Sequence, residues 1–214
     1  MINYFDLGAN EGKTIELMLR IFKDLNIKEY HIWAFEPMGK LYDILQDKFM
    51  QDERIHVFKF AISETGGMTK LYHCHNNVGH SIFATKNNID INDYEMVLAL
   101  TFPNFLFTFI PSFKEDANIL KVNIEGAEWY LFHDLVKYDL LRYFPMICGH
   151  CNAKKHPVDI EKIGIFQNNL TYWNQFMDEN GIIVRRFTDH NIEKNIDMKT
   201  FILEEFLGKN PCLV

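Results

Sequence analysis

The chain has 214 residues, 48% of them hydrophobic, and a formal net charge of −7. This length and apolar content are sufficient for one compact domain with a substantial core. The acidic balance argues against binding to DNA or RNA, which normally requires a basic face, so we expect no nucleic-acid partner.

No segment has the composition of a membrane span or a signal peptide. The longest apolar-rich stretch, residues 96–113, is interrupted by Pro103, Asn104 and Pro111, whereas a spanning helix needs about 20 predominantly apolar residues. The N-terminus lacks a basic segment followed by an apolar one, and four cysteines do not suggest a disulfide framework. We therefore expect a cytoplasmic protein with no membrane span.

Strands and helices alternate along the first part of the chain. Short apolar runs predict strands, and apolar residues at helical spacing predict helices. The expected order is a strand at 3–7, a helix at 12–25, a strand at 31–35, a helix at 40–50, a strand at 55–60, a short strand at 68–73 and a polar loop at 74–93. The segment 94–113 is rich in Phe and Leu and does not favour one type of structure.

Regular alternation returns near residue 119. The pattern predicts a strand at 119–124, a helix at 125–136, a strand at 146–149, a helix at 159–179 and closing strands at 182–187 and 200–206. Asn180-Gly181 is typical of the end of a helix. Together these elements predict an α/β fold: a Rossmann-like, seven-stranded, mostly parallel sheet covered by helices on both faces.

The first strand begins at about residue 2, with no helix before it. We expect residues 1–214 to form a single domain. The abrupt start favours a domain excised from a longer polypeptide over a minimal enzyme.

The first turn, Asp6-Leu-Gly-Ala-Asn-Glu-Gly12, follows a strand and opens a helix. In open α/β sheets, ligands bind at the carboxyl ends of the strands. A pyrophosphate site requires G-x-G-x-x-G without acids, whereas Asp6 and Glu11 would both face a diphosphate. An acid there suits a ligand with an ammonium or sulfonium charge, such as S-adenosyl-L-methionine (SAM), and the glycines allow close approach of the backbone. The alternative is a structural turn without a ligand.

Glu36 follows the second expected strand, and Pro37 ends that strand. A carboxylate has two acceptor oxygens that match the two hydroxyls of a ribose, as an adenosine ligand requires. The alternative is an acid placed at the start of a helix, where the helix dipole favours it.

These residues belong to a wider set of motifs. The set comprises Asp6–Gly12, Ala34-Phe35-Glu36-Pro37, Ala61-Ile62-Ser63, Gly79-His80-Ser81 and Leu120-Lys-Val-Asn-Ile-Glu-Gly-Ala-Glu128. With them, residues 6–128 resemble the FkbM family of SAM-dependent methyltransferases. One departure is Asn123, where the family usually has Asp. A neutral amide can orient a ligand, but it cannot act as a base and is a poorer metal ligand.

The resemblance implies the sheet of a SAM-dependent methyltransferase and O-methylation of a hydroxyl on a sugar, glycan or glycosylated metabolite. The residues expected to bind SAM are Asp6, Gly8, Ala9, Asn10, Gly12, Thr14, Glu36, Pro37, Ala61, Ile62, Ser63 and Asn123. The expected partner is a carbohydrate or glycoside acceptor, and an excised domain would be fused to other glycan-processing domains. One alternative is methylation of a non-sugar small molecule. The other is a SAM-binding domain without turnover, and Asn123 favours this second alternative.

A sugar hydroxyl is a poor nucleophile, so the transfer needs a base. The catalytic candidates are Glu125 and His150, at adjacent strand ends, with Asn123 beside them. An imidazole can accept a proton near neutral pH, although His150 is equally well explained as a hydrogen-bonded residue at a strand end. Glu128 is better explained as an acid in the first turn of a helix.

Two groups of His and Cys residues raise the question of a metal. One contains Cys148, His150, Cys151 and His156, and the other spans residues 73–80. Since there is no second C-x-x-C, a structural zinc site is not predicted. A divalent ion such as magnesium would suit a sugar site better, but no clear set of oxygen ligands is present, so no metal-binding residue is predicted.

Aromatic residues are the last candidates for substrate contact. Trp129 directly follows the acidic motif and could contact the acceptor, although burial in the core is the more common role of such a residue. Tyr172, Trp173 and Phe176 fall at helical spacing and are expected in the core.

Overall fold

The structure is a computed structural model that describes residues 1–74, 79–86, 88–150, 169–185 and 195–208. In this part of the chain the main sheet has six strands in the order β3-β2-β1-β7-β8-β9, and all of its pairs are parallel. The strands are β1 (Ile2–Leu7), β2 (Tyr30–Phe35), β3 (Ile55–Phe58), β7 (Ala117–Val122), β8 (Met146–Gly149) and the short β9 (Val184–Arg185). The strand order reverses at β1, as in Rossmann-like folds.

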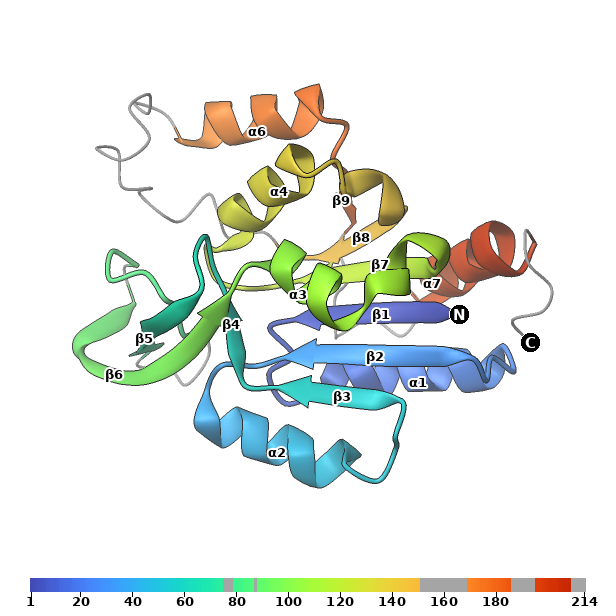
Figure 1. Ribbon diagram of the computed structural model, residues 1–214, viewed down its shortest axis with the longest axis horizontal. Helices are drawn as coiled ribbons and strands as arrows, with labels where there is room; N and C mark the ends of the chain where they lie inside the picture. Colours follow the sequence, from blue (N-terminus) through green and yellow to red (C-terminus); the bar gives the residue numbers. More distant parts are fainter. Residues whose placement is uncertain (75–78, 87, 151–168, 186–194, 209–214) are drawn as a thin grey trace.

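Helices cover both faces of this sheet (Figure 1). They are α1 (Lys13–Asp24), α2 (Gly39–Phe49), α3 (Phe102–Phe109), α4 (Glu128–Lys137), α6 (Asn169–Glu179) and α7 (Asn195–Phe201), which continues into a π-helix at Ile202–Leu207. Short 3₁₀ helices lie at Pro111–Glu115 and Leu141–Tyr143. Successive strand side chains point to opposite faces, so Tyr4 packs in the core with α1 and α2, while Phe5 and Leu7 pack with α3, α4 and α6.

A second, smaller sheet projects from the carboxyl ends of the main strands (Figure 1). It consists of β4 (Phe60–Ile62), β6 (Ile89–Leu100) and β5 (Gly67–Cys74), in that order. β5 and β6 are antiparallel, whereas β4 and β6 are parallel. This sheet therefore stands above the edge where ligands bind in an α/β fold.

The structure confirms the Rossmann-like α/β alternation and corrects several expected elements. The expected strand at 55–60 is divided at Lys59 between β3 and β4, which belong to different sheets. β6 begins within the expected loop at 74–93 and ends in the unassigned segment, which also contains α3. The helix expected at 125–136 begins only at Glu128, because residues 123–127 form a loop over the sheet.

The last expected strand, 200–206, was wrong, because these residues are helical. Met198, Ile202 and Phe206 are all buried, and their spacing of four residues is that of a helix face. The sheet of the described chain consequently has six parallel strands instead of seven mostly parallel ones.

Two further expectations can be compared only in part. α6 begins at Asn169, and residues 159–168 of the expected helix lie outside the described residues. β9 covers Val184 and Arg185, and residues 186–187 also lie outside. In the described part of the chain, no helix combines the length and apolar character that crossing a bilayer requires.

Candidate functional site

A cavity that is open to solvent lies at the carboxyl ends of β1, β2 and β7. It is bounded by the loop after each of these strands, by β4 and by residues 79–82. Its position matches the ligand crevice of open α/β sheets, beside the point where the strand order reverses. The predicted residues that line it are Gly8, Asn10, Glu36, Pro37, Ala61, Ile62, Asn123 and Glu125.

Asp6 lies beneath the first turn and does not line the cavity. Its side chain is fully buried, and it forms an ion pair with Lys121 at an Oδ1–Nζ distance of 2.7 Å. The Thr14 hydroxyl donates to Asp6 Oδ2, and Lys121 Nζ donates to the carbonyl of Gly8 at 2.6 Å. Asp6 and Thr14, both expected at the ligand, therefore hold the turn from below. Lys121, from β7, pairs with Asp6 and also bonds to the turn.

Gly8 and Gly12 are required by the shape of this turn. Both have positive φ, 83° and 84°, which side chains disfavour. A Cβ on Gly8 would lie 2.0 Å from the carbonyl oxygen of Asn123, and one on Gly12 would lie 2.6 Å from the Phe49 ring. Gly8 thus lets the loops after β1 and β7 approach at the cavity, whereas Gly12 serves the packing of α1 against α2. Ala9 is buried and also does not line the cavity.

Glu36 joins the loops that follow β1 and β2. The backbone N–H of Asn10 donates to its Oε2 at 2.9 Å, and that of Met38 donates to its Oε1 at 3.0 Å. Burial raises the pKa of this carboxyl from 4.5 to about 7, although both hydrogen bonds oppose the shift. Each oxygen keeps acceptor capacity, because a carboxylate offers about four acceptor positions and only two are used.

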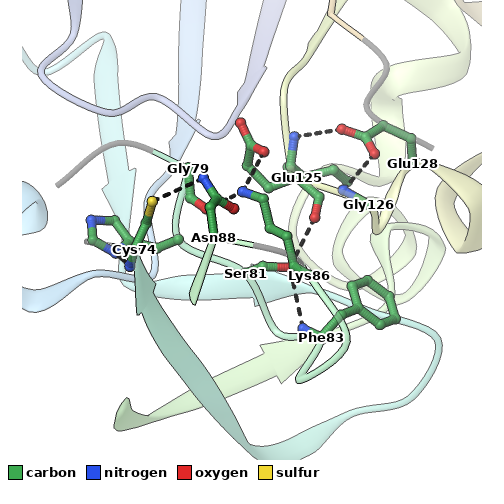
Figure 2. A network of polar contacts seen from close by, with 11 residues as sticks. Cys74, Gly79, Ser81, Phe83, Lys86, Asn88, Glu125, Gly126 and Glu128 are labelled. Atoms are coloured by element: carbon green, nitrogen blue, oxygen red, sulfur yellow. Dashed lines mark hydrogen bonds and ion pairs between the residues drawn. The ribbon is translucent and has the colours of Figure 1, made fainter. Parts of the chain in front are cut away.

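The loop between β7 and α4 is held by Glu128. Its carboxylate accepts from the backbone N–H of Ile124 at 2.9 Å and of Gly126 at 2.7 Å, as Figure 2 shows. The side chain is fully buried, and burial raises its pKa to about 7. The assignment of Glu128 to the first turn of a helix is confirmed, since α4 begins there. Between these anchors, Glu125 adopts a left-handed conformation with φ 52°.

Glu125 lines the cavity as an ion-paired acid (Figure 2). Its Oε2 lies 2.7 Å from Nζ of the buried Lys86, which also donates to the carbonyl of Gly79. A Cβ on Gly79 would lie 2.8 Å from Lys86 Nζ, so glycine leaves room for this ion pair. The sequence did not indicate a role for Lys86, because it lies within the expected polar loop at 74–93 and carries no motif of its own.

His80 lines the cavity, whereas His150 does not. His80 Nδ1 lies 3.1 Å from the backbone nitrogen of Cys74, which donates to it. A neutral His80 ring must therefore carry its proton on Nε2. His150 is exposed after β8, and its backbone N–H donates to the carbonyl of Val122 at 2.8 Å. The motif Gly79-His80-Ser81 was the signal that could have identified this histidine.

The remaining predicted residues lie outside the first cavity. Ser63 and Trp129 line a second, neighbouring cavity. Trp129 is also buried against Trp173 and Phe176, with ring centroids 5.4 and 5.5 Å apart, so the core role expected for those two residues is confirmed. Nothing is described of the Tyr172 side chain.

No metal centre is evident in the described residues, because they contain no group of three or more His, Cys, Asp or Glu side chains placed to hold an ion. Cys151 and His156 lie outside the described residues. His73, from the other expected group, instead lies 2.9 Å from Asp93 and 3.5 Å from Glu95.

No protein-family model, curated protein sequence or solved structure matches this chain. The fold and cavity define a Rossmann-like α/β protein with a candidate ligand site where the strand order reverses.

Proposed function

We propose that the protein is a SAM-dependent O-methyltransferase that acts on a hydroxyl of a sugar or glycan. The observation that carries this proposal is the position of Glu36, a buried carboxylate that lines the cavity and holds the loops after β1 and β2. Residues of the five motifs shared with the FkbM family also meet around this one cavity, although they come from segments far apart in the chain.

The cavity has the groups that a SAM molecule requires. Glu36 has acceptor positions left for the two ribose hydroxyls. Gly8 and Asn10 present the first turn to the methionine portion, and Phe60 and Leu71 offer apolar surface for the adenine. Asp6 contributes indirectly, because it fixes the turn through Lys121.

Methyl transfer forms an O–CH₃ bond, breaks the S–CH₃ bond and releases S-adenosylhomocysteine (SAH) together with the hydroxyl proton. SAM supplies the electrophilic methyl group, so the protein mainly positions the reactants and accepts the proton. Glu125 is the candidate base that faces the cavity. His80 is suited to donate from Nε2 rather than to accept, and Asn123 can orient a ligand without taking a proton.

One observation favours a second candidate, a SAM-binding domain without turnover. Nζ of Lys86 already donates to Oε2 of the Glu125 carboxylate at 2.7 Å, so one of the two oxygens that could accept a proton is engaged. Asn123 cannot replace it. Methylation of a non-sugar acceptor remains a variant of the first candidate.

Calorimetric titration with SAM, SAH and NAD tests the proposal. We expect binding of SAM and SAH, followed by transfer of a labelled methyl group to members of a hexose and deoxyhexose glycoside panel. Binding of NAD without a response to either SAM compound would refute it. Binding of SAM with no transfer to any acceptor class would favour the second candidate.

A further inference from the structure

The second cavity is open to solvent and lies directly beside the first. Residues 63–69, residues 82–85 and the start of α4 form its walls. Ile82 lines both cavities, and neighbouring residues of the β7–α4 loop divide between them: Glu125 lines the first and Gly126 the second. A molecule in the second cavity would therefore adjoin the loop that carries the candidate base.

The wall between the two cavities is fixed by hydrogen bonds (Figure 2). The Ser81 hydroxyl donates to the carbonyl of Glu125 at 2.9 Å and accepts from the backbone N–H of Phe83 at 3.2 Å. At the other end of residues 81–86, the ion pair between Lys86 and Glu125 fixes the chain to the same loop. Figure 2 shows the Phe83 ring pointing away from that ion pair, and this ring lines the second cavity. Residues 81–86 thus separate a charged pair, Lys86 and Glu125, at the first cavity from an aromatic residue, Phe83, at the second.

Half of the described residues that line the second cavity carry an aromatic ring or a hydroxyl group. The rings of Phe83 and Tyr130 stack at a centroid distance of 5.8 Å and an interplanar angle of 22°, with Trp129 beside Tyr130 in α4. The lining residues that carry a hydroxyl group are Ser63, Thr65, Thr69, Tyr72, Thr85 and Tyr130. Among the described residues that line this cavity, the one charged side chain is Glu64.

Aromatic rings together with hydroxyl groups suit a carbohydrate ligand. A pyranose has apolar C–H faces that pack on aromatic rings, and it carries hydroxyls around its edge that pair with hydroxyls and a carboxylate. Lys or Arg would favour a phosphate or carboxylate ligand, and neither is among the described lining residues.

We infer that the second cavity is the acceptor site and binds an uncharged pyranose against Tyr130, with its reactive hydroxyl directed past Ile82 toward Glu125. This inference rests on the proposed function and specifies where its acceptor binds. Tyr130 is half-buried and is a specificity residue for the acceptor, with no part in SAM binding.

Two variants alter this cavity and two serve as controls. Tyr130→Ala removes the ring, and Ala84→Trp fills the cavity from an exposed lining position. Tyr130→Phe keeps the ring, and Tyr138→Ala removes an exposed tyrosine just beyond α4 that lines neither cavity. Thermal unfolding of all four variants identifies any that fail to fold.

The probes are an array of immobilised uncharged pyranose glycans and, for affinity, methyl pyranosides followed by ligand-observed NMR, each with and without SAH. We expect the wild type, Tyr130→Phe and Tyr138→Ala to retain glycans. Tyr130→Ala and Ala84→Trp should bind them at least about tenfold more weakly, the loss expected for one ring contact. Calorimetric SAH affinity should stay unchanged in all four.

Equal glycan binding by the wild type, Tyr130→Ala and Ala84→Trp would overturn the assignment of the acceptor to this cavity. Binding of no glycan under either condition would overturn the carbohydrate class, and binding of simple phenols instead would identify the replacement. Failure of the wild type to bind SAM or SAH would count against the proposed function and not this site, since glycan binding is also measured without them.

Discussion

Lowering the pH from 8 to 6 is expected to weaken SAM binding about tenfold through the titration of Glu36. Burial raises the pKa of this carboxyl to about 7, so it is mostly ionised at pH 8 and mostly protonated at pH 6. The ionised form keeps acceptor positions for both ribose hydroxyls after bonding to Asn10 and Met38, whereas protonation removes one. If SAM binds only the ionised form, affinity follows the ionised fraction, which is roughly one tenth at pH 6.

Calorimetry at pH 6 and pH 8 measures this effect, and titrations in buffers of different ionisation enthalpy count the protons. Binding at pH 6 should release about one proton from Glu36. The ammonium group of SAM also titrates in this range, so its contribution has to be separated from that of the protein. Glu36→Gln makes this separation, because it keeps the shape of the side chain and removes its ionisation.

Glu36→Gln should weaken SAM binding at pH 8 by about 1–3 kcal/mol, because the ribose hydroxyls lose a charged acceptor. The pH dependence that remains in this variant belongs to the ligand. Glu53→Gln, at an exposed acid away from the cavity, is the control and should behave as the wild type. If wild type and Glu36→Gln show the same dissociation constants at both pH values, the ribose does not contact Glu36 and the reasoning is refuted.

Three further predictions concern the loops around the cavity. Gly8→Ala should lower the free energy of unfolding in urea by at least about 2 kcal/mol, because φ is positive and the new Cβ would clash with the carbonyl of Asn123; wild-type stability would contradict this. Glu125→Gln should lower turnover by about 10²–10⁴-fold with SAM affinity unchanged, while His150→Ala should keep its turnover; the reverse result would make the histidine the base. Burial raises the pKa of Glu128 from 4.5 to about 7, so its contribution to stability is complete below pH 4.5 and is lost as the pH rises through 7. The unfolding free energy should therefore fall by up to about 3 kcal/mol across this range, and a pH dependence that is the same in Glu128→Gln would exclude that carboxyl.

Local features of the sequence were sufficient to predict the alternating elements and the edge of the sheet that holds the cavity. β1, β2, β7 and β8 are short, largely apolar runs, and a polar residue follows each of them closely. The parallel arrangement places these strand ends at one edge of the sheet. For that reason Gly8, Glu36 and Glu125, which follow three different strands, could be expected to meet.

The roles of individual side chains required the tertiary structure. Asp6 was expected at the ligand, but it pairs with Lys121 beneath the turn. His150 follows a strand as expected, yet it is exposed outside the cavity, whereas His80 lines it. The end of a strand determines the position of a residue at the edge of the sheet. The neighbouring chain segments determine the direction in which its side chain points.

The formation of the second, smaller sheet and of the helix at residues 195–207 also depends on contacts with residues far along the chain. β6 contains polar residues that predicted a loop, and it becomes a strand by pairing with β5. Residues 200–206 suggested a strand, but they are helical, and Ile202 and Phe206 are buried on one face of the helix. Periodicity within a segment determines what it can form by itself, whereas pairing and burial against residues far along the chain decide what it does form.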